Sequence, residues 1–60
     1  MDDKAMLAYA LATECDAITM YRHMIKNMPD EYRKQLLHIL KEEKEHAQML
    51  SAMIKSAGKE

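Results

Sequence analysis

The single proline of the chain, Pro29, stands between two blocks in which apolar residues recur at helical spacing. Proline disfavours helical geometry in the residue before it, so a first helix should end near Asn27. Proline also suits the first turn of a following helix. Because the connection is only a few residues long, the two helices must run antiparallel. The pattern predicts an all-α helical hairpin, with helices over about residues 3–27 and 30–57 in a single domain of residues 1–60.

Each predicted helix carries one apolar stripe. Its members are separated by three or four residues, which is the spacing that places side chains on one face of a helix. The two stripes consist of Leu7, Ala10, Leu11, Ala17, Ile18, Tyr21, Ile25 and Met28, and of Tyr32, Leu36, Ile39, Leu40, Ala47, Leu50, Met53, Ile54 and Ala57. The two stripes are therefore expected to face each other across the hairpin.

Charged residues stand at the ends of both blocks, where they favour helix termini. Asp2 or Asp3 can cap the first helix, because a carboxylate accepts hydrogen bonds from the free N–H groups of the first turn. Lys55 and Lys59 suit the last turn of the second helix, and Gly58 suits the position just beyond it.

The chain is too short to form a large core by itself. It has 60 residues and one cysteine, so no internal disulfide can stabilise it, and below roughly 70–80 residues a single core seldom supplies enough stability. Two helices in contact along one line also leave much of their apolar stripes exposed to water. Two hairpins packed face to face would close a four-helix bundle. The sequence therefore predicts a homodimer or a higher even-numbered oligomer.

Charge and hydropathy exclude several other classes of partner. The formal net charge is −1, with 9 basic and 10 acidic residues interspersed, so no basic patch for nucleic acid or an anionic membrane is expected. No apolar run approaches the ~20 residues that a membrane-spanning helix needs. The segment MDDKAML lacks the features of a signal peptide. A single cysteine suits a reducing compartment, and we expect a cytoplasmic protein.

Three polar residues fall inside the apolar stripes. Glu14 interrupts the first stripe, and Glu43 and His46 interrupt the second. In an antiparallel hairpin that turns between Met28 and Pro29, the numbers of facing residues add up to 57, and those of Glu14 and Glu43 do so. The two carboxylates should therefore lie opposite each other, where an unpaired buried charge is costly. The simpler interpretation, charged residues on a solvated helix surface, does not account for this matched position.

A two-fold dimer would bring two copies of Glu14, Glu43 and His46 to the same level. Its four carboxylates would carry four negative charges, which two divalent cations would neutralise. One Glu from each of two helices, together with a Glu-x-x-His motif from each of the other two, is the ligand set of carboxylate-bridged dimetal bundles. The spacing thus indicates a metal site with Glu14, Glu43 and His46 as ligands. Glu42 is a rival ligand, because it lies four residues before His46.

These residues resemble the ferritin-like superfamily, and within it the rubrerythrins and the encapsulated ferritins. Members have a Glu in the first helix and a Tyr seven residues later, as Glu14 and Tyr21 are here, and an E-E-x-x-H-A motif in the second, as in EEKEHA. The resemblance implies a di-iron centre across a subunit interface. It also implies that Glu14 bridges the two metal ions and that Glu43 and His46 are terminal ligands, each bound to one ion. Tyr21 would then hydrogen-bond a ligand carboxylate. In encapsulated ferritins such a protein lies within a protein compartment.

Several other reactive or metal-binding residue types lie off the central stripes. His23 and His38 are expected to be solvated or to lie between subunits. Cys15 is expected to be a small buried residue with no role as a nucleophile. A line of methionines at Met20, Met24 and Met28 widens the apolar face of the first helix and is expected to pack against further chains.

Together these features predict a di-iron carboxylate protein that oxidises Fe(II) with oxygen or peroxide. Two iron ions per dimer are expected because the donors are oxygen-rich and paired, and zinc or manganese remain open as alternatives. The alternative function is a self-associating helical module without catalysis, or a structural site for zinc or manganese. The sequence does not identify a shell-forming partner protein or an electron-donor partner.

Overall fold

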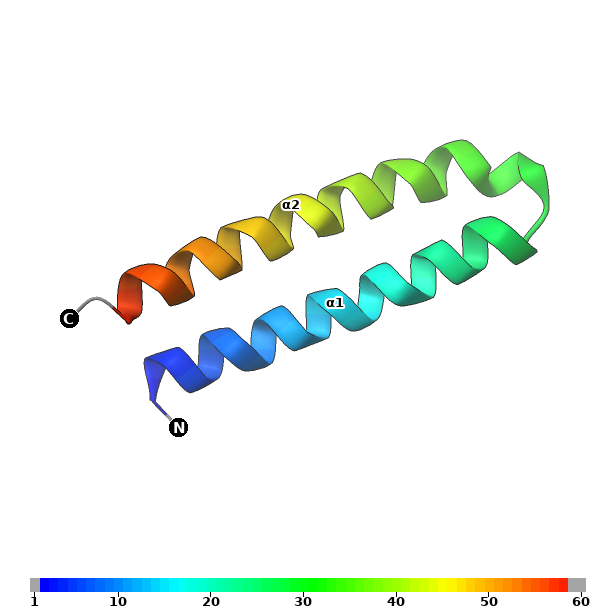
Figure 1. The fold of residues 1–60 in the computed structure, drawn as a ribbon. Helices are drawn as coiled ribbons and strands as arrows, with labels where there is room; N and C mark the ends of the chain where they lie inside the picture. The colour runs from blue at the N-terminus through cyan, green and yellow to red at the C-terminus, as the bar shows by residue number, and fades with distance from the viewer. Residues whose placement is uncertain (1, 59–60) are drawn as a thin grey trace.

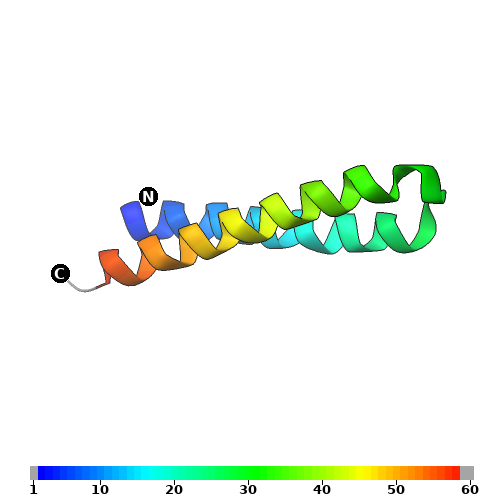
Figure 2. The ribbon, with the colours of Figure 1, turned by 90° about the horizontal axis from the view of Figure 1, so that it is seen from above.

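The computed structural model describes residues 2–58 and shows two long helices joined by a short turn. Helix α1 spans Asp3–Asn27, the 3₁₀ helix η1 spans Asp30–Tyr32, and helix α2 spans Arg33–Ala57. The two long helices run antiparallel, side by side over their whole length (Figures 1 and 2). The molecule is accordingly long and thin, with extents of 47 × 17 × 11 Å. No strand is present in residues 2–58, so the described chain is an all-helical hairpin.

The helix ends follow from local chemistry. Asp2 caps α1, since its Oδ1 accepts a hydrogen bond of 2.7 Å from the N–H of Ala5. Met28 ends α1 because it adopts an extended backbone before Pro29. Gly58 follows α2 with a right-handed helical backbone, so the position does not depend on the conformational freedom of glycine. Lys59, which was expected in the last turn of the second helix, lies outside the described residues.

The second helix begins differently from the expected α-helix at residue 30. Residues Asp30–Tyr32 form η1, and the N–H of Tyr32 donates to the carbonyl of Pro29 at 3.1 Å. This tighter hydrogen-bonding pattern is common in the first turn of a helix. The first backbone N–H groups there have no carbonyl group four residues earlier within the helix to accept their hydrogen bonds. The regular α-helix starts at Arg33, directly after this turn.

The interface between α1 and α2 buries few side chains fully. Only Leu36 and Leu40, at 6% and 8% exposure, are buried within residues 2–58. Most other members of the two predicted stripes are half-buried, but Met28, Tyr32 and Met53 are exposed. The reason is geometric, because two cylinders touch along a single line and leave the flanks of each stripe open. A single hairpin therefore has almost no interior.

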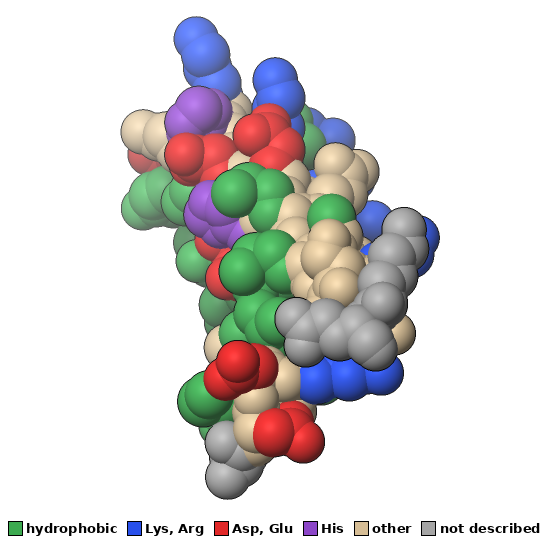
Figure 3. Space-filling view, turned by 90° about the vertical axis from the view of Figure 1, so that its left-hand side faces the viewer, with side chains coloured by type: hydrophobic (Ala, Val, Ile, Leu, Met, Phe, Trp, Pro, Cys, Tyr) green, Lys and Arg blue, Asp and Glu red, His purple; other side chains and the backbone are tan. Residues whose placement is uncertain are grey.

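Large exposed apolar side chains gather on one side of the hairpin, which we call the open face. We define it by Met6, Tyr9 and Met20 of α1 and by Met49 and Met53 of α2, all at least half exposed. The two helices share this side, because a groove of about 360 Å³ lies between Met6 and Met53. Figure 3 shows hydrophobic side chains along one side, with histidine and acidic side chains beside them and Lys and Arg at the margins. This face has no partner within the hairpin.

The opposite side of the hairpin holds Cys15, which is exposed. The expectation that Cys15 is buried is therefore wrong. Cys15 follows Glu14 by one residue, which is about 100° around the helix, and this turn carries it past the line of contact with α2. It lies at a shallow groove lined also by Ser51 and Lys55.

Neither long helix in residues 2–58 combines the length and the apolar character that a membrane span requires.

Candidate metal centre

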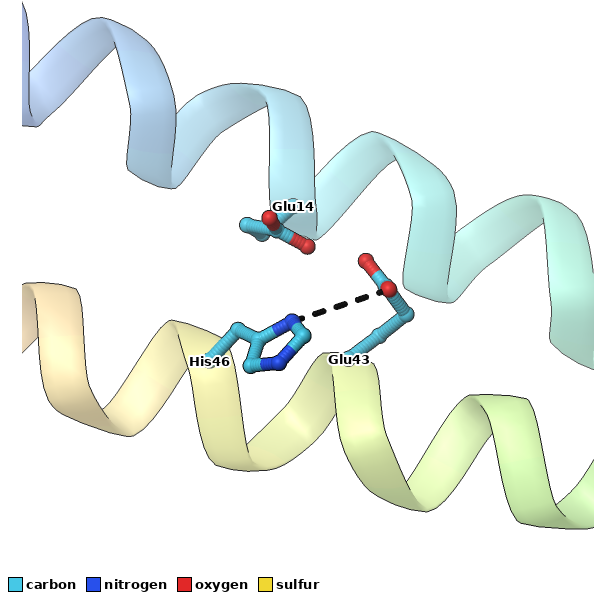
Figure 4. A group of neighbouring side chains, drawn as sticks. All are labelled: Glu14, Glu43 and His46. Carbon is cyan, nitrogen blue, oxygen red and sulfur yellow. Dashed lines mark ion pairs between the residues drawn. The ribbon is translucent and has the colours of Figure 1, made fainter.

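Glu14, Glu43 and His46 come together near the middle of the hairpin. One potential ligand atom from each residue lies within 4.8 Å of the other two. Figure 4 shows Glu14 projecting from α1 towards Glu43 and His46, which lie one turn apart on α2. The antiparallel pairing explains this proximity, because Glu14 and Glu43 lie at the same distance from the turn. The structure thus brings together all three residues that the sequence singled out.

The group is partly shielded from solvent and partly open. The side chain of Glu43 is 20% exposed and that of His46 is 51% exposed, and His46 Nδ1 lies 3.7 Å from Glu43 Oε1. Glu14 is half-buried. The half-open geometry follows from the position of His46, which lies three residues before Met49 and seven before Met53 and so faces the same side of α2. The group therefore opens onto the open face.

One oxygen of the group has no partner. Glu14 Oε2 is shielded from water, and it accepts no hydrogen bond from any described residue. A shielded acceptor without a partner is destabilising, and more so when it carries charge. A bound cation would satisfy this oxygen directly. The unpaired oxygen, together with a second carboxylate and an imidazole nearby, fits a divalent metal ion.

The neighbouring carboxylates also perturb each other. The pKa of Glu43 is raised above its ordinary value, first by hydrogen bonding with Glu14, then by desolvation and by repulsion from the charge of Glu14. His46 acts in the opposite direction and lowers the pKa of Glu43. The group therefore holds more negative charge than it can easily accommodate, which is the condition that a cation relieves.

The composition of the group narrows the choice of metal. Two carboxylates and one imidazole suit iron, manganese or zinc, whereas closed structural zinc sites commonly use thiolates. The only thiol, that of Cys15, is not part of the group. Three donors from one hairpin also leave open positions for further ligands or substrates.

Glu42 does not belong to the group. Its Oε1 lies 3.4 Å from His38 Nε2, and both side chains are more than half exposed. Of the two adjacent carboxylates, Glu43 is the one that faces Glu14. Within the hairpin, Glu42 is therefore a partner of His38 and not a competing member of the cluster.

Two further residues considered from the sequence lie apart from the three donors. Tyr21 is half-buried and lies two turns beyond Glu14, and among the described residues no hydrogen bond joins it to the group. Its contact with a ligand carboxylate stays a prediction. His23 is exposed, and its Nδ1 lies 3.2 Å from Asn27 Nδ2. The described hairpin adds no acidic, histidine or cysteine residue to the predicted three.

The raised pKa of Glu43 predicts an unusual pH dependence for the metal-free protein. Because folding raises this pKa, the charged carboxylate destabilises the fold above the raised value, and protonation relieves that cost as the pH falls towards the ordinary value. The contribution of Glu43 to the free energy of unfolding should therefore increase on mild acidification. Denaturant unfolding in chelator measures it, as the difference between the parent and Glu43→Gln.

The control for this pH dependence is the metal-loaded protein. With metal bound, acid protonates the ligands and should lower the stability instead. Parallel curves for the parent and Glu43→Gln in chelator would contradict the raised pKa.

Comparison with known proteins connects this geometry to a family. The family model of rubrerythrin matches residues 5–60. Searches of curated proteins and of solved structures gave no significant match. The family match extends over both helices and includes all three clustered residues. The chain belongs to the rubrerythrin family.

Proposed function

We propose that two copies of the hairpin pack open face to open face and bind two iron ions between them. The observation that carries this proposal is the group of Glu14, Glu43 and His46, with one unpaired, shielded oxygen on Glu14. Membership of the rubrerythrin family supports iron as the metal. The four-helix bundle, the dimer and the iron pair are all parts of this one proposal.

A second copy completes both the core and the site. The exposed apolar residues of the open face gain a partner, and such patches on small proteins commonly mark interaction surfaces. The clustered residues lie near the middle of α1 and of α2. A two-fold axis through the cluster therefore lets the two hairpins overlap along their full length. It also places four carboxylates around two divalent cations, which balances the charge.

The proposed roles are those that the resemblance to the family implies, and the positions of the three clustered donors support them. Glu14 carries the unpaired oxygen, so it can contribute both carboxylate oxygens and bridge the two ions. Glu43 and His46 would each bind one ion from α2, one turn apart. Tyr21 would donate its hydroxyl hydrogen to a ligand carboxylate and hold it in place. The packed apolar residues around the four carboxylates would keep bulk water away.

The proposed reaction is the oxidation of Fe(II), which enters as the substrate. Two Fe(II) ions lose one electron each, and these two electrons, with two protons, reduce O₂ to H₂O₂ or reduce H₂O₂ to two waters. Bound iron supplies the redox chemistry, and the protein supplies positioning and charge compensation. Glu43 has a raised pKa, so this carboxylate can hold a proton near the site before the cation arrives.

Iron titration of the purified protein tests the function. Anaerobic addition of Fe(II) should saturate at two ions per dimer, and exposure to oxygen should then oxidise both ions faster than free Fe(II) in the same buffer. Iron content and mass in solution are measured on the same sample. Tight binding of zinc or manganese without Fe(II) oxidation would favour the structural metal site instead. Self-association without any metal binding would favour the non-catalytic module.

A further inference from the structure

The methionines are distributed differently from the other large aliphatic residues. Leucine and isoleucine occupy the contact between α1 and α2, and Leu37 is the one exposed residue of these two types within residues 2–58. A hydrophobic helix face could use leucine or methionine equally well, because the two have similar volumes and helix propensities. Five of the eight large apolar side chains that are exposed within residues 2–58 are nevertheless methionines, namely Met6, Met20, Met28, Met49 and Met53. Thioether groups are therefore concentrated where the hairpin has no partner of its own.

The exposed methionines of the two helices lie on one flank of the hairpin. At about 100° per residue, Met6 and Met20 fall within roughly 40° of each other around α1, and Met49 and Met53 do so around α2. Met6 and Met53 line one groove of about 360 Å³, which joins the two pairs across the open face. The other flank carries the thiol of Cys15. The thioethers and the thiol are thus on opposite sides of the molecule.

A methionine side chain differs from a leucine side chain in its reaction with peroxide. Hydrogen peroxide transfers one oxygen atom to the thioether sulfur, and the products are a sulfoxide and one molecule of water. The sulfur loses two electrons, which break the O–O bond of the peroxide. The sulfoxide is polar and disrupts an apolar interface.

The oxidant is available from the proposed reaction. Hydrogen peroxide is the product whenever two Fe(II) ions reduce O₂ by two electrons. Met49 lies only three residues after His46, one of the clustered donors, on the same side of α2. Peroxide released from the iron centre would therefore arise beside the open face.

We propose that Met6, Met20, Met49 and Met53 form a peroxide-sensitive modification site that controls the pairing of the open faces. With intact thioethers, the face is apolar and pairs with a second copy. With sulfoxides, pairing would bury polar groups that have no hydrogen-bond partner, which is costly. Peroxide reaches the face when the hairpins separate, and oxidation then prevents them from pairing again. The effect on pairing rests on the proposed function, whereas the reactivity of the four exposed thioethers does not.

The mass in solution after peroxide treatment tests this site. The full chain carries Cys15→Ser, so that no thiol reacts, and Zn(II) replaces iron, so that no metal redox chemistry takes place. Hydrogen peroxide should add oxygen to the four methionines, as measured by mass spectrometry. It should raise the dissociation constant of the dimer at least about 100-fold, since the loss of two buried methionine contacts already corresponds to such a factor. Methionine sulfoxide reductases should restore the dimer.

Two reciprocal variants separate this site from the other methionines. A variant with all four site methionines changed to leucine keeps the face apolar and of similar volume. It should pair like the parent and should stay paired after peroxide. The double variant Met24→Leu and Met28→Leu keeps the four thioethers, so its dimer should remain as sensitive to peroxide as that of the parent.

The failure of the site differs from the failure of the proposed function. If peroxide separates the parent and the four-leucine variant alike, or if the parent stays paired with oxygen on all four methionines, the site alone is overturned. A parent that is monomeric before peroxide is added overturns the proposed dimer and the control of its pairing together. Recovery with the reductases leaves all methionines in place, so it decides the question even if the four-leucine variant does not fold. Oxidised protein that stays monomeric after full reduction of its sulfoxides would also overturn the site.

Discussion

Replacing Glu14 with alanine should abolish the proposed paired metal site. The change removes the shielded oxygen that has no partner in the hairpin, and symmetry removes it twice in a dimer. Two of the four core carboxylates are then lost, so iron content should fall well below two per dimer and Fe(II) oxidation should be lost. Helix content should persist, because alanine favours helix and the change removes a shielded charge. Iron per dimer, circular dichroism and the initial oxidation rate measure these effects.

The matched control for Glu14→Ala is Glu45→Ala. Glu45 is exposed on α2 and does not belong to the cluster, so its loss should leave iron content and oxidation near those of the parent. Glu43→Ala and His46→Ala should weaken binding and slow oxidation but retain partial occupancy, since Glu14 remains. Full iron content in Glu14→Ala would show that Glu14 is not a metal ligand.

Replacing Met49 with glutamate should dissociate the dimer and unfold the chain at low concentration. Met49 is 63% exposed in the hairpin, but the proposed dimer covers it. Loss of a buried methionine costs about 1.5–3 kcal/mol, and the two-fold axis applies this cost twice. The dissociation constant should therefore rise by at least about 100-fold. A separated hairpin has only two buried residues among 2–58, so helix content should fall together with the mass.

Leu37→Glu is the matched control for Met49→Glu. Leu37 is another large exposed apolar residue of α2, at 44% exposure, but it lies roughly 160° around the helix from Met53. It is therefore on the side away from the open face, and its change to glutamate should leave the dimer intact. Sedimentation across a concentration series measures both variants. A helical, cooperatively folded monomer of the parent at micromolar concentration would rule out the proposed dimer.

The sequence by itself determined the hairpin and the meeting of the three donors. Pro29 separates two helical blocks, and the short connection leaves the chain no arrangement other than antiparallel. Once that pairing is known, position along the helix depends only on distance from the turn, because every residue adds the same rise. Glu14 and Glu43 are equally far from the turn, and helical spacing adds His46 to the same face. The approach of these side chains was therefore predictable from position alone.

The tertiary structure alone decided how deeply each residue is buried and which partner each side chain takes. Periodicity gives the direction of a side chain but not what lies in that direction, so the exposure of Cys15, Met28, Tyr32 and Met53 could not be predicted. Glu42 lies four residues from both His38 and His46, and in the structure it pairs with His38. This pairing depends on side-chain conformations and on the neighbouring helix. The unpaired oxygen of Glu14 likewise appears only once α1 and α2 are in contact, because burial is a property of packed surfaces and spacing along one helix does not encode it.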